Sequence, residues 1–196
     1  MEADNIDGKK EPKRLPVWAC IPLFIVVLFI FIGLYGTLVS GGLSLVLGVE
    51  ARHPGVVGYI FVEAGMLLAV LTAAVILLRL ERRPFSDLGL SLKGHANGLW
   101  YGLLVAILLY LLGFGISVVL GEIEVTGFQF KPLDLLGSWV FFLLVALFEE
   151  ILMRGYILGR LLHTNMNKFL ALFISSALFA FMHIFNPEIA FLPMLN

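Results

Sequence analysis

The stretch Leu135–Leu162, with the sequence LLGSWVFFLLVALFEEILMRGYILGRLL, decides the fold. It is long and apolar enough for a transmembrane helix, which needs roughly 20 mostly apolar residues. Besides Arg160 near its end, it carries the charged side chains of Glu149, Glu150 and Arg154. Because it exceeds the length that one span needs, we expect a helix that tilts or protrudes from the bilayer. Ionisable groups inside a span are costly, and they are therefore candidates for function.

The composition of the whole chain excludes several classes of protein. Of the 196 residues, 60% are apolar and only 14% are charged, whereas soluble domains carry about 25% charged residues. The mean hydropathy is +1.01. This composition excludes a soluble globular domain, whose outer faces must be polar, as well as a disordered chain and a nucleic-acid binder. The single Cys20 excludes a disulfide framework and a cysteine-based zinc cluster.

The chain contains five apolar runs, of which the last is slightly short for a span. They are Val17–Val39, Gly55–Leu80, Gly98–Leu120, Leu135–Leu162 and Phe169–Phe185. The runs lack the period-2 alternation of a membrane barrel. We therefore predict an all-α, polytopic membrane helix bundle with about five transmembrane helices. We expect residues 1–16 to form a polar tail, residues 17–80 two N-terminal spans and residues 81–196 a membrane core.

The basic residues predict how the spans are oriented. With the N-terminus inside, ten Lys and Arg side chains fall on the cytoplasmic side, while only Arg52 and Lys131 fall outside. The ten are Lys9, Lys10, Lys13, Arg14, Arg79, Arg82, Arg83, Lys93, Arg160 and Lys168. Cytoplasmic loops carry such an excess of positive charge. We expect an integral multi-pass protein of the plasma membrane, embedded in the lipid bilayer with a cytoplasmic N-terminus.

The ionisable residues inside the spans gather near the end of the chain. They are Glu63, Glu149, Glu150, Arg154 and His183, and four of these five lie in the last two spans. Glu150 and Arg154 are four residues apart, so they share a helix face and can form an ion pair. Glu149 points about 100° away from Glu150 and has no such partner. The carboxylate of Glu149 is therefore a candidate general base.

His183 is the predicted partner of Glu149. The connection at about residues 163–168 is short, so the two helices that it joins are antiparallel neighbours. At ~1.5 Å per residue, Glu149 lies roughly 20 Å and His183 roughly 22 Å from this inner turn. The two side chains therefore sit at nearly the same depth. A carboxylate and an imidazole that face each other can hold and activate a water molecule.

These residues resemble a known family. The pattern Glu149-Glu150-x-x-x-Arg154 followed by Phe179-x-x-x-His183 resembles the first two motifs of the CAAX-protease and bacteriocin-processing family of intramembrane endopeptidases, which includes Abi-type proteins. The supporting context is also similar: Ser86-Asp87-Leu88-Gly89-Leu90 precedes a Gly-rich span, and Asn186-Pro187 follows the motif histidine. The resemblance covers about residues 80–196, and it marks the membrane core as protease-like.

The resemblance implies hydrolysis of a peptide bond inside the membrane. Glu149 would activate a water molecule with the help of His183. Glu150 and Arg154 would support the site, and Phe179 would form a wall of its pocket. The implied substrates are membrane-embedded or prenylated peptides and leader peptides. A divalent metal such as zinc, held by Glu149 and His183, stays an open question, and the sequence has no HExxH motif.

The chain departs from the family pattern after His183. Family members carry a further motif on another span, a His followed four residues later by Asn or Asp, which contributes to the oxyanion site or to metal ligation. No such motif follows His183. We infer either an N-terminal fragment of a longer protein or a catalytically incomplete member.

Three other interpretations stay open. The charged residues of the last two spans are alternatively a structural ion-pair network, with His183 as a hydrogen-bonded core side chain. The protein is alternatively a non-catalytic immunity or scaffold protein of the same fold. A small transporter that uses Glu63, Glu149 and Glu150 as a proton relay is a third reading, although no internal repeat supports it.

Some smaller features are predicted to serve packing. Ser176 lies on the same helix face as His183, and we interpret its hydroxyl as a helix-packing group. Gly98-x-x-x-Gly102 and Gly155-x-x-x-Gly159 fit close helix packing within the chain. Glu63 is expected either to line the same cavity as Glu149 or to reach the outer interface.

Overall fold

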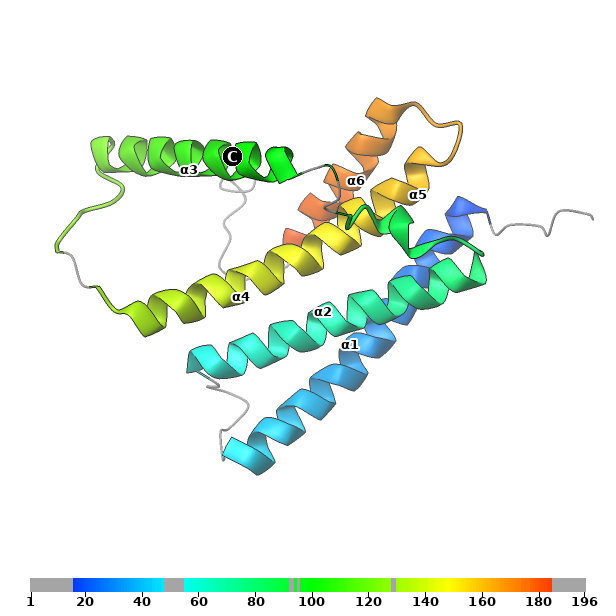
Figure 1. Cartoon of the computed structure of the whole chain (residues 1–196), viewed down its shortest axis with the longest axis horizontal. Helices are drawn as coiled ribbons and strands as arrows, with labels where there is room; N and C mark the ends of the chain where they lie inside the picture. The colour runs from blue at the N-terminus through cyan, green and yellow to red at the C-terminus, as the bar shows by residue number, and fades with distance from the viewer. Residues whose placement is uncertain (1–15, 48–54, 92–93, 95, 128–129, 185–196) are drawn as a thin grey trace, which may run out of the picture.

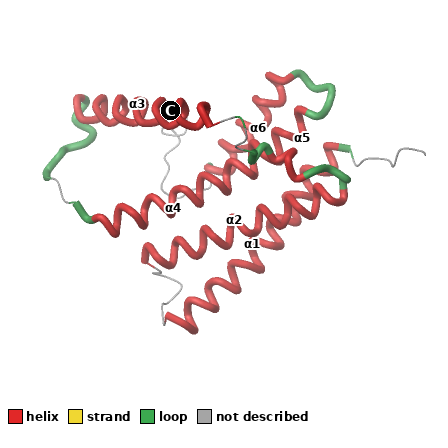
Figure 2. The backbone as a smooth tube through the Cα atoms, viewed as in Figure 1, coloured by secondary structure: helices red, strands yellow, loops and turns green. Residues whose placement is uncertain are grey.

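The computed structural model describes residues 16–47, 55–91, 94, 96–127 and 130–184. The predicted polar tail up to residue 15 and the Asn186-Pro187 pair lie outside the described residues. Within the described ranges every regular element is a helix and none is a strand. The predicted all-α class is therefore confirmed (Figures 1 and 2).

Among the described residues, four helices are long and apolar enough to cross a membrane, and a shorter apolar helix follows them. The elements are α1 (Val17–Leu47), α2 (Gly55–Leu80), the 3₁₀ turn η1 (Phe85–Leu88), α3 (Ala96–Val119), α4 (Pro132–Glu150), the π-helix η2 (Ile151–Leu158), α5 (Gly159–Leu162) and α6 (Lys168–His183). The predicted fourth span is thus built from α4, η2 and α5, whose junctions keep helical backbone angles. The predicted fifth span is α6.

The directions of the helices agree with the charge count. Figure 1 shows the start of α1, the end of α2 and the turn between α5 and α6 on one side of the molecule. The basic residues Arg79, Arg82, Arg83, Arg160 and Lys168 belong to this side. That this side is cytoplasmic stays a prediction from the distribution of positive charge.

Helices α2 and α4 lie side by side and run parallel (Figure 1). Gly137 lets them approach closely, because a Cβ atom at this position would lie 2.8 Å from a Val56 methyl group. One turn further along, the rings of Tyr59 and Phe141 meet edge to face at 6.3 Å between centroids. Both contacts fix the register of α2 against α4.

The α6 helix starts with a local capping signal. Asn167 stands just before α6, and its side chain accepts a hydrogen bond of 2.8 Å from the backbone N–H of Phe169. This contact satisfies one of the N–H groups that a helix start leaves without a partner. Because α5 ends at Leu162, the connection to α6 is as short as the sequence predicts, and α6 folds back along η2 (Figure 1).

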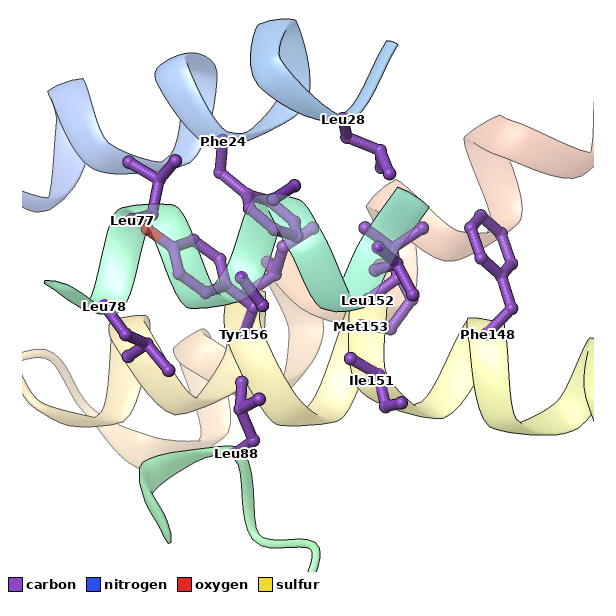
Figure 3. Packing of buried hydrophobic residues seen from close by; sticks show 14 of the residues in the cluster. Phe24, Leu28, Leu77, Leu78, Leu88, Phe148, Ile151, Leu152, Met153 and Tyr156 are labelled. Carbon is purple, nitrogen blue, oxygen red and sulfur yellow. The ribbon is translucent and has the colours of Figure 1, made fainter. Parts of the chain in front are cut away.

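The buried core lies where α1, α2, η1 and η2 meet (Figure 3). Phe24 of α1 stacks on Tyr156 of η2 with 3.8 Å between ring centroids. Leu77 of α2 and Leu88 of η1 are buried in the same cluster. Because lipid tails are as apolar as these side chains, the cluster is stabilised by close packing more than by removal from water.

The Gly155-x-x-x-Gly159 pattern packs against a turn rather than against a helix. A Cβ atom on Gly155 would lie 3.1 Å from the carbonyl oxygen of Leu88, and one on Gly159 would lie 3.6 Å from that of Asp87. The prediction of close packing is confirmed here, but the partner is η1. Gly89 ends this turn with a φ of +70°, a left-handed conformation that glycine adopts without strain.

Helix α3 stands apart from the other helices (Figure 1). Its described side chains are exposed along almost its whole length, as expected for a span that faces lipid. The predicted packing of Gly98-x-x-x-Gly102 within the chain is wrong for the described residues, because no atom lies within 4 Å of a Cβ atom at either glycine. The reason is that none of the other described helices covers this face of α3.

The tight contact at Gly155 gives a first prediction. Replacing Gly155 with Leu places a branched side chain against the carbonyl oxygen of Leu88, a backbone atom that cannot turn aside as a flexible side chain can. We expect this variant to be destabilised by about 1–3 kcal/mol, the usual cost of overpacking. Thermal unfolding in detergent measures the effect. Gly102→Leu on the uncovered face of α3 is the control, and an equal loss there would contradict the proposed contact.

Candidate active site

The ends of α4 and α6 bring the motif residues together. Glu149 is the last residue but one of α4, and His183 is the last residue of α6. His183 Nε2 lies 3.5 Å from Glu149 Oε1, and both side chains are 33% exposed. The proximity that the depth comparison predicts is therefore present. What these two residues do chemically stays a prediction.

The backbone orients the imidazole of His183. Its Nδ1 atom lies 2.9 Å from the carbonyl oxygen of Phe179, one turn earlier in α6. When Nδ1 carries the proton, it donates to this carbonyl, and Nε2 then presents a lone pair to Glu149. The Phe179 ring lies 4.4 Å from the imidazole, measured between centroids. The imidazole is thus held both by its own helix backbone and by a neighbouring ring.

Glu150 and Arg154 form the predicted ion pair. The side chain of Arg154 is 70% exposed and that of Glu150 is 49% exposed, so the pair is not buried inside the protein. Glu150 is thereby compensated by a cation, whereas the partner of Glu149 is an imidazole. The two adjacent carboxylates therefore have different environments, as their positions on the helix predict.

A pocket of about 370 Å³ lies between the α4–η2 segment and α6. Its lining residues are Ala146, Glu149, Glu150, Met153, Arg154, Leu158, Leu172, Ser175, Ser176 and Phe179. Both carboxylates and the guanidinium are on its polar side, and the predicted wall residue Phe179 is among its apolar members. Such a mixture of apolar walls and a few convergent polar groups is typical of ligand sites.

Sequence reasoning missed Ser175. This residue is buried, and its hydroxyl donates a 3.4 Å hydrogen bond to the carbonyl of Met153 inside the π-helix. Ser176, which the sequence singled out, is exposed and lines the pocket. Because a π-helix can be recognised only from its hydrogen bonds, nothing in the local sequence marks Ser175 as the residue that contacts it.

A buried ion pair was also missed. Glu81, which follows α2, pairs with Arg160 of α5, and their side chains are 1% and 7% exposed. The hydroxyl of Tyr156 donates a 2.6 Å hydrogen bond to Glu81 Oε1. From the sequence, Arg160 was assigned only to the cytoplasmic side, and Glu81 was not among the candidate site residues. The four-residue spacing of Tyr156 and Arg160 places both side chains on one helix face, and this spacing could have indicated that they share a partner.

Glu63 lies on α2 and is half-buried. The register of Val56 with Gly137 and of Tyr59 with Phe141 places Glu63 about one helical turn from the level of Glu149. It is not one of the residues that line the pocket. Of the two positions expected for Glu63, a place in the lining of this pocket is therefore not seen among the described side chains, although the two carboxylates lie on neighbouring helices.

The described residues do not make up a metal centre by themselves. They contain no group of three or more His, Cys, Asp and Glu side chains placed to hold an ion. Glu149 and His183 supply two ligands, while a catalytic zinc site takes three from the protein. Glu149 and His183, the two ligands that the resemblance implies, lie close together in space. The described residues supply no third ligand beside them.

Comparison with known proteins identifies the stretch that holds this site. Residues 131–195 match the family described as Rce1-like, type II CAAX prenyl endopeptidase Rce1-like. This match confirms the resemblance to the CAAX-protease family for the residues that carry both motifs, and it begins at residue 131 instead of near residue 80 as expected. No curated protein and no solved structure matches the chain. The four apolar helices indicate an integral membrane protein, and the match shows that its residues 131–195 are similar to the CAAX-protease family.

The contact of Ser175 with the π-helix gives a second prediction. Ser175→Ala removes a buried hydrogen bond to Met153 and should cost about 0.5–1.5 kcal/mol of stability. Ser176→Ala removes an exposed hydroxyl from the adjacent position and should leave stability unchanged. Thermal unfolding of both variants in the same detergent makes the comparison. Equal melting temperatures would show that the Ser175 hydroxyl does not hold η2.

Proposed function

We propose that this chain carries the catalytic pair of an intramembrane endopeptidase, in which Glu149 and His183 activate the water that hydrolyses a peptide bond. One observation carries the proposal: a carboxylate and an imidazole nitrogen lie 3.5 Å apart beside a pocket, at the level that the sequence predicts. The match of residues 131–195 to a CAAX prenyl endopeptidase family supports it.

The chemistry follows from the two groups. An ionised Glu149 and the Nε2 lone pair of His183 both accept hydrogen bonds, so a water molecule bound beside these two atoms can donate one to each. Glu149 takes the proton as the water oxygen attacks the substrate carbonyl carbon. The same proton then passes to the nitrogen of the breaking C–N bond, which leaves as an amine. The products are a free carboxyl group, a free amino group and a regenerated Glu149 carboxylate.

The neighbouring ion pair keeps the second carboxylate out of this reaction. Glu150 is held by Arg154, so its charge is already compensated. We assign to this pair a supporting role at the polar side of the pocket. The apolar side chains of Leu158, Leu172 and Phe179 form the wall against which a substrate side chain would pack.

We assign a membrane-associated peptide as the substrate class, with a prenylated C-terminal peptide as the specific case. The family description names a prenyl endopeptidase, and it supports this choice. The location of the pocket agrees with it, because the pocket lies beside helices that span the membrane. A substrate anchored in the same bilayer reaches such a site by lateral diffusion.

A cleavage assay tests the proposal. The full-length protein is reconstituted in liposomes with a prenylated peptide that ends in a CAAX sequence, and release of the C-terminal fragment is followed by mass spectrometry. Glu149→Gln and His183→Ala should each lower kcat by at least about 100-fold, because a general base contributes roughly 10²–10⁴-fold. Glu124→Gln, at an exposed position outside the helices, is the matched control.

The same variants separate the enzyme from the non-catalytic alternative. Undiminished cleavage in Glu149→Gln or His183→Ala, with the protein folded, would remove the proposed assignment. If a partner protein binds equally well to the parent chain and to Glu149→Ala, and neither cleaves the peptide, the immunity or scaffold reading replaces the enzyme.

A further inference from the structure

A buried polar cluster lies at the opposite end of the π-helix from Glu149. Glu81 pairs with Arg160 and accepts a 2.6 Å hydrogen bond from the hydroxyl of Tyr156. Arg160 Nη2 also lies 3.9 Å from the sulfur of Cys20 in α1. Tyr156 itself is fully buried and stacks on Phe24, as Figure 3 shows. The cluster therefore joins α1, the end of α2, η2 and α5 in one place.

The element that this cluster holds has an unusual geometry. Residues 151–158 form a π-helix, in which each hydrogen bond spans five residues where an α-helix spans four. π-helices are rare and occur mostly as short segments at functional sites. The π-helix here begins directly after Glu149 and Glu150 and ends directly before α5. It is thus placed between the motif carboxylates and the buried cluster.

A second face of the π-helix, next to the one that carries Tyr156, is held by the η1 turn. The carbonyl oxygen of Leu88 approaches the Gly155 Cα, and the carbonyl oxygen of Asp87 approaches Gly159. The side chain of Leu88 is buried in the core. These contacts need the glycines on one face and the Tyr156 and Arg160 side chains on another. Only one rotation of the segment satisfies both sets of contacts at once.

That rotation determines where His183 lies. If the segment changed from π to α geometry, the residues that follow would turn by roughly one residue step, about 100°. Helix α5 would turn with them, and α6 would follow because residues 163–167 form a short connection. His183, at the far end of α6, would then move away from Glu149. The distance between the two side chains therefore depends on contacts at the other end of η2.

We propose that Glu81, Tyr156 and Arg160 are positioning residues, which fix the rotation of the π-helix and thereby hold His183 against Glu149. The inference concerns geometry. Its consequence for catalysis rests on the proposed function. The three residues touch neither Glu149 nor His183, so they act on the site through η2, α5 and α6.

Cross-linking tests the geometry without any need for proteolysis. Glu149→Cys and His183→Cys are combined in the full-length protein, and the rate of cross-linking by a short bifunctional thiol reagent is measured. The two single-cysteine variants account for any contribution of the buried Cys20. The variant Tyr156→Phe is then added, which keeps the stacked ring and removes only the hydroxyl that donates to Glu81. It should lower the cross-linking rate about tenfold, since hydrogen bonds to charged groups are stronger than those between neutral groups.

A matched control and a second variant make the result decisive. Tyr110→Phe removes the same hydroxyl from an exposed position on α3 and should leave the cross-linking rate unchanged. Glu81→Met and Arg160→Met, made together in the Tyr156→Phe background, remove both buried charges and the hydroxyl that donates to Glu81, so none of these groups is left without its partner, and such replacements usually retain stability. This combined variant should keep its melting temperature and still lose about tenfold in cross-linking, because methionine and phenylalanine side chains cannot form the directional hydrogen bonds that fix the rotation of η2.

Two outcomes separate the positioning role from the proposed chemistry. An unchanged cross-linking rate in folded Tyr156→Phe and in the folded combined variant would overturn the positioning role. With Glu149 and His183 intact, Tyr156→Phe should also lower kcat for peptide cleavage about tenfold at unchanged KM. If cross-linking falls while kcat stays the same, the positioning role holds and the assignment of hydrolysis to Glu149 and His183 fails.

Discussion

A charge inside a membrane-spanning bundle must have a partner, because leaving an ionised group alone in a low-dielectric interior costs several kcal/mol. The described structure meets this requirement twice along one continuous helical segment and its neighbours, and it places an imidazole beside a third carboxylate. Glu150 pairs with Arg154, Glu149 faces His183, and Glu81 pairs with Arg160. Each pair also joins parts of the chain, and the last two join separate helices. The requirement for partners therefore determines much of how the bundle is assembled.

The parts of the fold that follow from local pattern could be predicted from the sequence. The apolar runs gave the membrane helices, and the four-residue spacing gave the Glu150–Arg154 pair. The contact of Glu149 with His183 was also predictable, because a short turn and a constant rise per residue determine the depth of each side chain. These predictions depend only on helix geometry, which the rest of the fold does not change.

Other features could not be predicted, because they depend on residues far apart in the sequence. The pairing of Glu81 with Arg160 has no local spacing to reveal it. The π-helix is stabilised by a turn on one face and a tyrosine on another, and neither partner can be identified from residues 151–158 alone. For the same reason the Gly98-x-x-x-Gly102 pattern gave a wrong prediction of close packing. Small residues permit a second helix to approach, but the rest of the fold determines whether a helix lies there.

The separation of Glu81 from its partners has a consequence for biosynthesis. Tyr156 follows Glu81 by 75 residues. At ~5–20 residues per second, a ribosome needs roughly 4–15 seconds to make that interval. During this time α2 has already been synthesised, while the carboxylate at its end still lacks both the hydroxyl and the guanidinium that later surround it. The nascent chain must therefore keep Glu81 in contact with water or lipid headgroups, and the core of the bundle closes only after α5 has been made.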